Sequence, residues 1–260
     1  MLHFALIGEK LGHSLSVPIH EALYAMLGID ADYRLVPIPK ESFDEDVRAL
    51  MGEVDGFNIT IPYKQRIMPL LGGLDARAEA VGAVNTVAMR EGARGYNTDV
   101  PGFRDMLLHH GMDPRGLPCF CLGTGGASRA VRAALAELGA ASVTMVSRHP
   151  EGEEIGYDAL PERFEGLLVN CTPAGMFPHA EGCPVPDELL DAVLSRARGV
   201  ADLIYNPAET RLTLAAKAHG VPACTGLYML VAQAVEAERI WLGRDLPADL
   251  TARILPLIHG

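Results

Sequence analysis

Residues 122–130 read Leu122-Gly123-Thr124-Gly125-Gly126-Ala127-Ser128-Arg129-Ala130 and combine a glycine-rich turn with the start of a helix. A short apolar run, 117–122, precedes them. A helical pattern over 131–138 and a second β-rich run over 141–146 follow. A strand, a glycine turn, a helix and a second strand in this order are typical of a dinucleotide-binding unit. The alternative is an ordinary loop between a strand and a helix.

Each glycine of this turn has a physical reason in a nucleotide site. Gly123 permits a tight turn, and Gly125 and Gly126 let the backbone approach a pyrophosphate. The amides at the start of the new helix then face that negative charge. Ser128 stands where the usual pattern has a third Gly or Ala, and it is small enough for close helix–strand packing. The candidate cofactor contacts here are Gly123, Gly125, Gly126 and Ala127.

The composition is that of an ordinary globular protein of one large or two modest domains. The chain has 260 residues, 49% of them hydrophobic and 21% charged. A net charge of −11 argues against nucleic acid or an anionic membrane as the main partner. Five cysteines without a C-x-x-C pair indicate a reducing, cytoplasmic compartment, and no metal site is expected. We predict no signal peptide and no membrane span, and a monomer or a homodimer.

The order of elements predicts the α/β class with two domains. From residue 117 onward strands and helices alternate as in a doubly wound sheet, with strands expected at 118–122, 142–147, 167–170 and 200–204. The pattern changes near residue 100, which we take as a domain boundary. In the first part, we expect a helix over residues 63–71.

Polar side chains gather at the expected strand ends of the first hundred residues. Hydroxyl, amide, lysine and aspartate groups in this number suit a small polyhydroxylated anion, and one Lys–Asp pair can move a proton. Taken singly, each has a structural explanation as a turn residue, a helix cap or a solvated side chain. Lysine is rare in this chain, so a lysine inside a dense motif favours a function. The residues are Ser14, Ser16, Asn58, Thr60, Lys64, Asn85, Thr86, Asn97, Thr98 and Asp99.

With these motifs and several later ones, the sequence resembles the shikimate dehydrogenase family along nearly its whole length. The matching stretches occur in the family's order, which makes the signal very specific. They are Ile7-Gly8, His13-Ser14-Leu15-Ser16 and His20; Phe57-Asn58-Ile59-Thr60-Ile61-Pro62-Tyr63-Lys64; Gly82-Ala83-Val84-Asn85-Thr86; Gly95-Tyr96-Asn97-Thr98-Asp99; Asn170-Cys171-Thr172-Pro173-Ala174-Gly175-Met176; Asp202-Leu203-Ile204-Tyr205-Asn206-Pro207 with Thr210; and Gly226-Leu227-Tyr228-Met229-Leu230-Val231-Ala232-Gln233-Ala234.

The resemblance implies an NADP-linked enzyme that interconverts 3-dehydroshikimate and shikimate. It implies an α/β substrate-binding domain over residues 1–100, completed by C-terminal helices over 227–260, and a Rossmann-type doubly wound nucleotide-binding domain over 101–226. The implied catalytic pair is Lys64 and Asp99. Further implied substrate contacts are Ser14 and Ser16 for the carboxylate, Thr60, Asn85, Asp99 and Gln233 for the ring hydroxyls, and Tyr205 near the substrate. Further implied cofactor contacts are Thr172, Gly226 and Met229.

One departure from the family pattern concerns the start of the first helix. The family usually has Pro after the second serine and Asn after the helix His, whereas this chain has Val17 and Glu21, with a proline shifted to Pro18. Both serines are retained, so we expect only a local change.

The choice between NADP and NAD depends on the end of the strand expected at 142–147. An NAD enzyme usually carries an acidic residue there, but this chain has Ser147 and Arg148, which can hold a 2′-phosphate. The family's second basic residue is replaced by Glu151, Glu153 and Glu154. We predict NADP over NAD, with NAD still possible and with weaker discrimination than two arginines would give.

Two other functions stay open at this point. A quinate or quinate/shikimate dehydrogenase of the same superfamily tolerates a hydroxyl on the ring carbon that bears the carboxylate, and the surroundings of Ser14 and Ser16 do not decide this. A non-catalytic metabolite sensor would keep the pocket but would not need both Lys64 and Asp99. The sequence therefore favours the enzyme.

Overall fold

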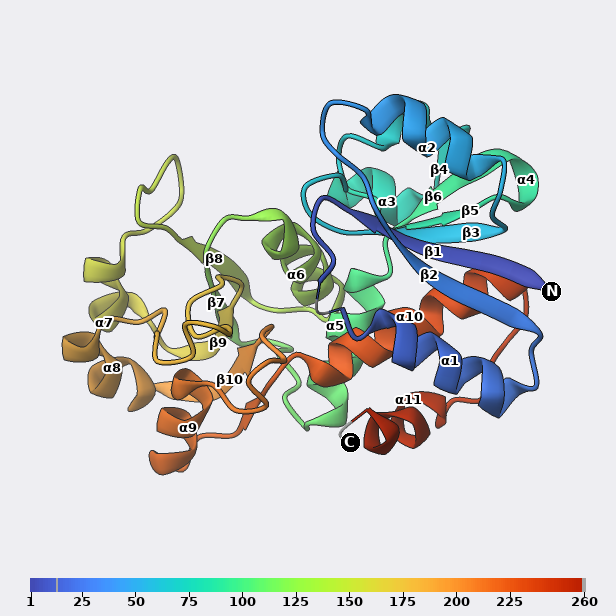
Figure 1. The fold of residues 1–260 in the computed structure, drawn as a ribbon. Helices are drawn as coiled ribbons and strands as arrows, with labels where there is room; N and C mark the ends of the chain where they lie inside the picture. Colours follow the sequence, from blue (N-terminus) through green and yellow to red (C-terminus); the bar gives the residue numbers. More distant parts are fainter. Residues whose placement is uncertain (13, 259–260) are drawn as a thin grey trace. The chain divides into compact units, whose positions relative to one another are not determined.

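The computed structural model describes residues 1–12 and 14–258 (Figure 1). Within them the chain forms two compact units: Met1–Asp99 together with the segment from Val231 onward, and Val100–Leu230. The first unit contains a mixed sheet and the second an all-parallel sheet. This confirms the predicted α/β class. None of the described helices combines the length and apolar character that a membrane span requires.

A mixed sheet forms the centre of the first unit. Its strands are β1 (Leu2–Gly8), β2 (Ala31–Pro37), β3 (Gly56–Ile59), β4 (Gly73–Leu74), β5 (Thr86–Ala88) and β6 (Arg94–Tyr96). They lie in the order β2-β1-β3-β5-β6-β4. β1 is parallel to β2 and β3, while β5 is antiparallel to β3 and β6. Most of β1 is buried, as expected of an inner parallel strand.

Apolar side chains on both faces of β1 anchor the helices of this unit. Alternate residues of a strand point to opposite faces. Ala5 and Ile7 join a buried cluster with Phe43 and Val47 of a helix, and Phe4 joins a second cluster on the other face. The helical segments of the unit are α1 (Ser16–Leu27), α2 (Phe43–Met51), η1 (Met68–Leu70), α3 (Ala76–Val81), α4 (Arg90–Ala93), α11 (Leu250–Ile254), η3 (Leu255–Leu257) and most of α10 (Leu227–Leu242).

The end of α10 completes the core of the first unit. The Trp241 ring stacks on Phe4 at 4.4 Å between ring centroids, and its indole N–H donates to the Val87 carbonyl oxygen at 2.9 Å. A Cβ at Gly56 would lie 2.3 Å from the indole nitrogen, so only glycine leaves room for this ring. A C-terminal helix thus packs directly against strands from the first hundred residues.

The second unit is built on a parallel sheet with strands β7 (Pro118–Leu122), β8 (Ser142–Val146), β9 (Gly166–Asn170), β10 (Ala197–Asp202) and β11 (Ala223–Cys224). Their order is β11-β10-β9-β7-β8. The chain goes from β7 to β8 on one side and then crosses to β9 on the other. The order therefore reverses at β7, and in such sheets ligands bind at the carboxyl ends of the two strands that flank the reversal.

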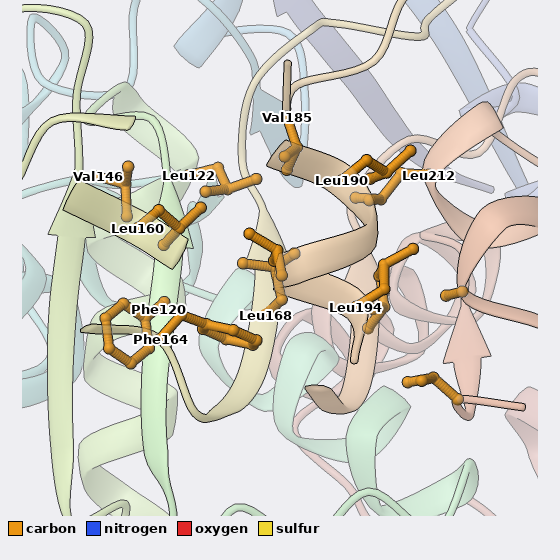
Figure 2. Close-up of a cluster of buried hydrophobic side chains, with 14 of the residues drawn as sticks. Phe120, Leu122, Val146, Leu160, Phe164, Leu168, Val185, Leu190, Leu194 and Leu212 are labelled. Carbon is orange, nitrogen blue, oxygen red and sulfur yellow. The ribbon is translucent and has the colours of Figure 1, made fainter. Parts of the chain in front are cut away.

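One face of this sheet carries a continuous hydrophobic core (Figure 2). Phe120 of β7 and Leu168 of β9 meet Phe164, Leu190 and Leu194 from the helical side, and the rings of Phe120 and Phe164 pack edge to face. The helical segments of the unit are α5 (Asp99–His109), α6 (Gly126–Glu137), η2 (Tyr157–Ala159), α7 (Leu160–Arg163), α8 (Asp187–Leu194) and α9 (Arg211–Ala218).

The helix expected over residues 63–71 is wrong. Turns occupy this segment up to the short η1. Pro69 would lie inside such a helix, where it removes a hydrogen bond and clashes with the preceding turn. The Lys64 carbonyl instead accepts from the Val84 backbone N–H at 2.7 Å. This contact ties the lysine to a distant segment instead of to its own helix.

Candidate active site

The first unit brings Lys64 and Asp99 together. Lys64 Nζ donates to Asp99 Oδ2 at 2.7 Å, and the two side chains are 20% and 13% exposed. The pair is thus shielded but still open to solvent on one side. Lys64 lies in the turn after β3, and Asp99 is the first residue of α5. Asp99 does more than begin a helix, because both its carboxylate oxygens accept from side chains.

Asn85 orients the other oxygen of Asp99. Asn85 Nδ2 donates to Asp99 Oδ1 at 3.0 Å. Its Oδ1 accepts from the Thr98 backbone N–H at 2.7 Å, so a backbone donor fixes which end of the amide faces the aspartate. Asn85 is 3% exposed and Thr98 is fully buried. The carboxylate therefore has a defined position before any ligand arrives.

Ser14 and Ser16 lie side by side at the start of α1. Ser14 Oγ donates to Ser16 Oγ at 3.0 Å, and the Ser16 backbone N–H donates to Ser14 Oγ at 3.2 Å. Two adjacent hydroxyls at a helix start suit a carboxylate. His13, part of the same motif, lies outside the described residues.

Gln233 and Thr60 stand in the same unit. Thr98 Oγ1 donates to Gln233 Oε1 at 3.3 Å, so α10 reaches the segment that carries Asp99. Thr60 follows β3, and its backbone N–H donates to the Ile7 carbonyl oxygen at 2.9 Å. A Cβ at Gly8 would lie 2.6 Å from the Thr60 methyl group, so Gly8 permits the close approach of this side chain.

The second unit forms a cradle at the reversal point of its sheet. Gly123, directly after β7, has φ of +91°, and a Cβ there would lie 2.7 Å from Thr172 Cγ2. Thr172 follows β9, the neighbouring strand. Both the backbone conformation and the space thus require glycine, as expected of a loop that receives a ligand's phosphates.

The loop leading into α6 presents bare backbone. Gly125 is the N-cap of α6 with no side-chain cap, and both Gly125 and Gly126 are exposed. A Cβ at either glycine would have no neighbour within 4 Å. Ser128 is buried and its hydroxyl donates to the Gly125 carbonyl oxygen at 2.6 Å, which tightens the turn. Free amides at a helix start fit a pyrophosphate, so these residues suit a dinucleotide.

A buried polar network holds Thr172 in place. Asn170 Oδ1 accepts from the Thr172 backbone N–H at 2.9 Å and from its hydroxyl at 2.8 Å. Asn170 Nδ2 donates to Asp202 Oδ1 at 2.9 Å, and Thr210 Oγ1 donates to Asp202 Oδ2 at 2.8 Å. Burial raises the pKa of Asp202 from 3.8 to about 6, although its hydrogen bonds from Ile204, Thr210 and Asn170 lower it.

Ser147 and Arg148 stand at the tip of β8. Arg148 is exposed, and Ser147 Oγ accepts from the His149 backbone N–H at 3.2 Å. In the acidic loop, the Glu151 backbone N–H donates to Glu154 Oε2 at 3.2 Å, and Glu151 and Glu153 are exposed. At least one carboxylate is thus engaged within the loop itself, which fits the interpretation of a solvated loop.

Tyr205, Gly226 and Met229 belong to the second unit. A Cβ at Gly226 would lie 2.1 Å from the Leu203 carbonyl oxygen, so this position requires glycine. The Gly226 backbone N–H donates to the Ile204 carbonyl oxygen at 2.9 Å. Tyr205 follows β10 and is half-buried, and burial raises the pKa of its phenol. Among the described residues, no three His, Cys, Asp or Glu side chains cluster in a way that would hold a metal ion.

The sequence reasoning gave no role to Tyr33, His20 and Glu238. Tyr33 Oη donates to Asn58 Oδ1 at 2.7 Å, and its ring stacks on His20 at 3.9 Å between centroids. His20 Nδ1 lies 2.6 Å from Glu238 Oε1, and both side chains are fully buried. The available signal was Tyr33 itself, because a tyrosine whose ring is buried needs a partner for its hydroxyl.

A Rossmann-type unit with a glycine cradle, joined in one chain to a unit that carries a shielded lysine–aspartate pair, defines a dinucleotide-dependent oxidoreductase. Comparisons with known proteins specify the family. Residues 6–87 match the domain described as "Shikimate dehydrogenase substrate binding domain", and residues 226–255 match "Shikimate 5'-dehydrogenase C-terminal domain". The NADP(+)-dependent shikimate dehydrogenase of Clostridium perfringens strain SM101 is 39% identical over 254 residues, covering 92% of each chain.

Solved structures that resemble this chain are also shikimate dehydrogenases. A chorismate mutase/shikimate 5-dehydrogenase fusion protein from Clostridium acetobutylicum superposes with a TM-score of 0.94 at 37% identity, covering 99% of this chain and 97% of that one. Shikimate 5-dehydrogenase from Thermus thermophilus, solved with NADP(H) and shikimate, gives 0.87 at 31% identity, with 99% and 100% covered. The chain therefore belongs to the shikimate dehydrogenase family.

Proposed function

We propose that this protein is an NADP-linked oxidoreductase that reversibly reduces 3-dehydroshikimate to shikimate. The observation that carries the proposal is the 2.7 Å contact between Lys64 and Asp99, with Asn85 fixing the aspartate from its other side. The relatives' names give the substrate and the cofactor. The same names do not favour a quinate-specific enzyme.

Lys64 is the proposed proton donor and acceptor. Reduction of a ketone builds negative charge on its oxygen, and a nearby ammonium stabilises that charge and then gives up a proton. Arginine could hold the charge but could not release the proton, because its pKa is above about 12. Asp99 orients the lysine and accepts from a neighbouring hydroxyl of the substrate. In the reverse direction, the neutral lysine takes the proton from the alcohol.

The remaining substrate contacts are assigned by chemistry. Ser14 and Ser16 present their hydroxyls together and donate to the carboxylate. The proposed contacts for the ring hydroxyls are Thr60, Asn85, Asp99 and Gln233, with Tyr205 near the substrate. On this proposal the first unit binds the substrate and the second binds the dinucleotide.

The second unit fits NADP through backbone and side-chain donors. Gly123, Gly125, Gly126 and Ala127 would hold the pyrophosphate, and Thr172 would line the same cradle. Ser147 and Arg148 would hold the 2′-phosphate, while Gly226 and Met229 would lie near the nicotinamide. NADP, when bound, supplies or accepts the hydride. The exposure of Glu151 and Glu153 supports a preference for NADP over NAD.

We further infer a cytoplasmic enzyme that acts as a monomer or a homodimer. Cys119 and Cys121 are buried in β7 as small core residues with free thiols, which suits a reducing compartment. Light scattering on the purified protein measures the oligomeric state directly.

A four-way assay tests the proposed function. The purified protein is given shikimate or quinate with NADP or NAD, and the formation of reduced cofactor is followed at several substrate concentrations. We expect the highest kcat/KM with shikimate and NADP. A higher kcat/KM with quinate would reject the proposed substrate, and no turnover of either acid would reject the proposed reaction.

A further inference from the structure

A fully buried histidine–glutamate pair joins two helices of the first unit. His20 Nδ1 of α1 lies 2.6 Å from Glu238 Oε1 of α10, and neither side chain is exposed to solvent. The two residues are 218 positions apart in the sequence, so the contact forms only when both ends of the unit have folded together. The two helices lie next to each other in the structure (Figure 1). The proposed mechanism uses neither side chain.

Aromatic rings surround the imidazole of His20. Tyr33 stacks on it at 3.9 Å between centroids with an interplanar angle of 7°, and the rings of Tyr24 and Trp241 lie at 6.1 and 5.6 Å. The Tyr33 hydroxyl donates to Asn58 Oδ1 at 2.7 Å, which holds the stacked ring in place. A hydrogen bond in such surroundings is strong and tolerates little change in its geometry. The pair therefore holds the two helices at one relative position.

Stability alone does not account for a buried pair of this kind. Taking two ionisable groups out of water is costly, and well-packed apolar side chains of similar volume commonly give equal or greater stability at such places. Apolar side chains, however, can pack in several positions, whereas a hydrogen bond of 2.6 Å accepts one. A gain in positional precision explains the pair of His20 and Glu238 where a gain in stability does not.

Each of the two helices also carries a proposed substrate contact. Ser16 lies four positions before His20, so their side chains share one face of α1, and both are buried. Gln233 lies five positions before Glu238 on α10, which is about 7.5 Å along the helix axis. Gln233 Oε1 accepts from Thr98 Oγ1 at 3.3 Å, in the segment that leads to the catalytic aspartate of the proposal. Because a helix moves as one body over this length, the buried pair fixes Ser16 relative to Gln233.

A second anchor of α10 serves a different purpose. Trp241 packs on Phe4 and donates to the Val87 carbonyl oxygen, and it thereby attaches α10 to the sheet. Glu238 instead attaches α10 to α1. Loss of the pair therefore leaves α10 on the core and changes only how it is placed against α1.

We propose that His20 and Glu238 are positioning residues that hold α1 and α10 at one relative position, here called their register. They thereby set the spacing between Gln233 and the two serines, Ser14 and Ser16. This inference rests on the proposed function, which places the substrate carboxylate at the serines and a ring hydroxyl at Gln233. A carboxylate and a hydroxyl on one ring have a fixed separation, so the two helices have to present their side chains at a matching distance.

Substitutions at Glu238 test the register through the KM for shikimate. Glu238→Leu removes the hydrogen bond at similar volume, and we expect this KM to rise about tenfold. The kcat and the KM for NADP should stay within about twofold of wild type, because Asn85 holds Asp99 independently of α1 and α10. Glu238→Gln keeps an acceptor for His20 and should retain most of the affinity for shikimate. A shikimate KM for Glu238→Leu within about twofold of wild type would overturn the proposal.

A shorter acid provides the same test in a milder variant. Glu238→Asp keeps the carboxylate and withdraws it from His20 by one methylene group. We expect the KM for shikimate to rise in this variant too, so the test does not depend on the folding of the leucine variant. An unchanged KM in Glu238→Asp would also contradict the proposed register.

The double variant His20→Leu with Glu238→Leu distinguishes positioning from stability. Glu238→Leu alone leaves the imidazole unpaired and should lower the melting temperature, whereas two leucines should restore it to at least the wild-type value. The KM for shikimate should nevertheless stay raised about tenfold, because two leucines do not define a register. A KM that returns to the wild-type value together with the melting temperature would make the pair merely structural and overturn the proposal.

An exposed pair of the same chemistry is the matched control. His3 Nδ1 lies 2.6 Å from Asp32 Oδ1, with the side chains 50% and 44% exposed. This pair joins β1 to β2, which are already neighbours in the sheet. His3→Leu with Asp32→Leu should therefore leave the KM for shikimate unchanged. An equal rise in this control would mean that the effect is not specific to the buried pair.

The indole N–H resonance of Trp241 tests the register without any substrate. The chain has one tryptophan, and its ring lies 5.6 Å from that of His20, so a single peak reports how α10 is placed against α1. Wild type and Glu238→Gln should give one sharp peak, and the double leucine variant several peaks or one broadened peak.

This resonance also separates the present inference from the proposed function. Several peaks or a broadened peak in the double leucine variant of a protein that does not turn over shikimate would retain the register and reject the function. An active wild-type enzyme whose double leucine variant keeps one sharp peak and the wild-type KM would retain the function and reject the register.

Discussion

The two units hold the polar groups of their candidate sites in opposite ways. In the first, charged and polar side chains hold one another, as Asn85 holds Asp99 and Asp99 holds Lys64. In the second, the loop at Gly125 and Gly126 is exposed backbone with open space around it, and its supporting network lies behind Thr172. Side-chain contacts discriminate among similar small molecules, whereas backbone amides accept any pyrophosphate. On the proposed function, specificity for the substrate depends on single side chains of the first unit, and cofactor choice depends on the tip of β8.

Removal of the lysine should give the largest effect. Lys64→Ala is expected to lower kcat by roughly 10²-fold or more with little change in the KM for shikimate, because a proton donor acts mainly in the transition state. Lys64→Arg should not restore the rate, since arginine keeps the charge but not the transferable proton. Lys217→Ala, which removes an exposed lysine paired with Glu209, is the control. A near-normal kcat in Lys64→Ala would remove the lysine from the mechanism.

Loss of both serines should affect the substrate and spare the cofactor. Ser14→Ala with Ser16→Ala deletes two donors to a carboxylate, and each such bond contributes about 1.5–3 kcal/mol. We expect the KM for shikimate to rise by roughly 10²-fold while the KM for NADP stays constant. Steady-state kinetics with each ligand varied in turn measures both. Ser195→Ala, at an exposed serine after α8, is the control and should change neither KM. A rise in the KM for NADP in the double serine variant would contradict the assignment of Ser14 and Ser16 to the substrate.

A substitution at the tip of β8 should have a smaller effect, and it should change the KM for NADP instead of the KM for shikimate. Arg148→Ala is expected to raise the KM for NADP about tenfold and leave that for NAD nearly unchanged, because only NADP carries the 2′-phosphate. Arg198→Ala, which removes a surface arginine paired with Glu165, is the matched control. Glu153→Gln should change little, since that side chain is exposed. A higher kcat/KM of the wild type with NAD would mean that the acidic residues Glu151, Glu153 and Glu154, and not Arg148, decide the choice of cofactor.

A substitution in the buried network of Asn170, Asp202 and Thr210 should change the free energy of unfolding and hardly change the kinetic constants. Because the pKa of Asp202 is raised from 3.8 to about 6, the folded protein holds a proton there between these values while the unfolded chain does not. Its contribution to stability is thus present at pH 4 and is lost as the pH rises through 6, by at most about 3 kcal/mol. Asp202→Asn should lack this part of the pH dependence.

Urea unfolding of wild type and Asp202→Asn at pH 4 and pH 7 measures the difference. Far-ultraviolet circular dichroism reports both units, whereas the fluorescence of Trp241, the chain's single tryptophan, reports the first unit. The pH-dependent difference should appear in the dichroism. If the two proteins show the same pH dependence in both signals, Asp202 is not titrating in this range.

The second unit could be predicted from sequence in more detail than the first. Its site follows from local order, because a strand, Gly123, Gly125 and a helix stand consecutively in the chain. In the first unit, the residues alone predicted a Lys–Asp pair within a polar cluster, and the family resemblance gave Lys64 and Asp99 their catalytic role. The apolar spacing after Lys64 predicts a helix, and this prediction is wrong because Pro69 interrupts the helix and the Lys64 carbonyl accepts from the Val84 backbone N–H instead.

The links between side chains could not be predicted from the residues at all. Tyr33, Asn58 and Thr86 lie on three strands, and which of them face one another depends on the register of the mixed sheet. The same holds for His20 and Glu238, which are 218 positions apart. Sequence patterns give the period of an element, whereas a buried hydrogen bond depends on where two elements meet in space.

The packing of Trp241 against Phe4 also orders events during synthesis. The second unit is one uninterrupted segment and can fold as soon as it has left the ribosome, whereas the first hundred residues lack part of their core until α10 emerges. Until then Phe4 and the Val87 carbonyl have no partner from α10. Newly made chains therefore pass through a stage in which the core of the first unit is partly uncovered until α10 is translated, and a nonsense mutation before Trp241 would leave that core permanently incomplete.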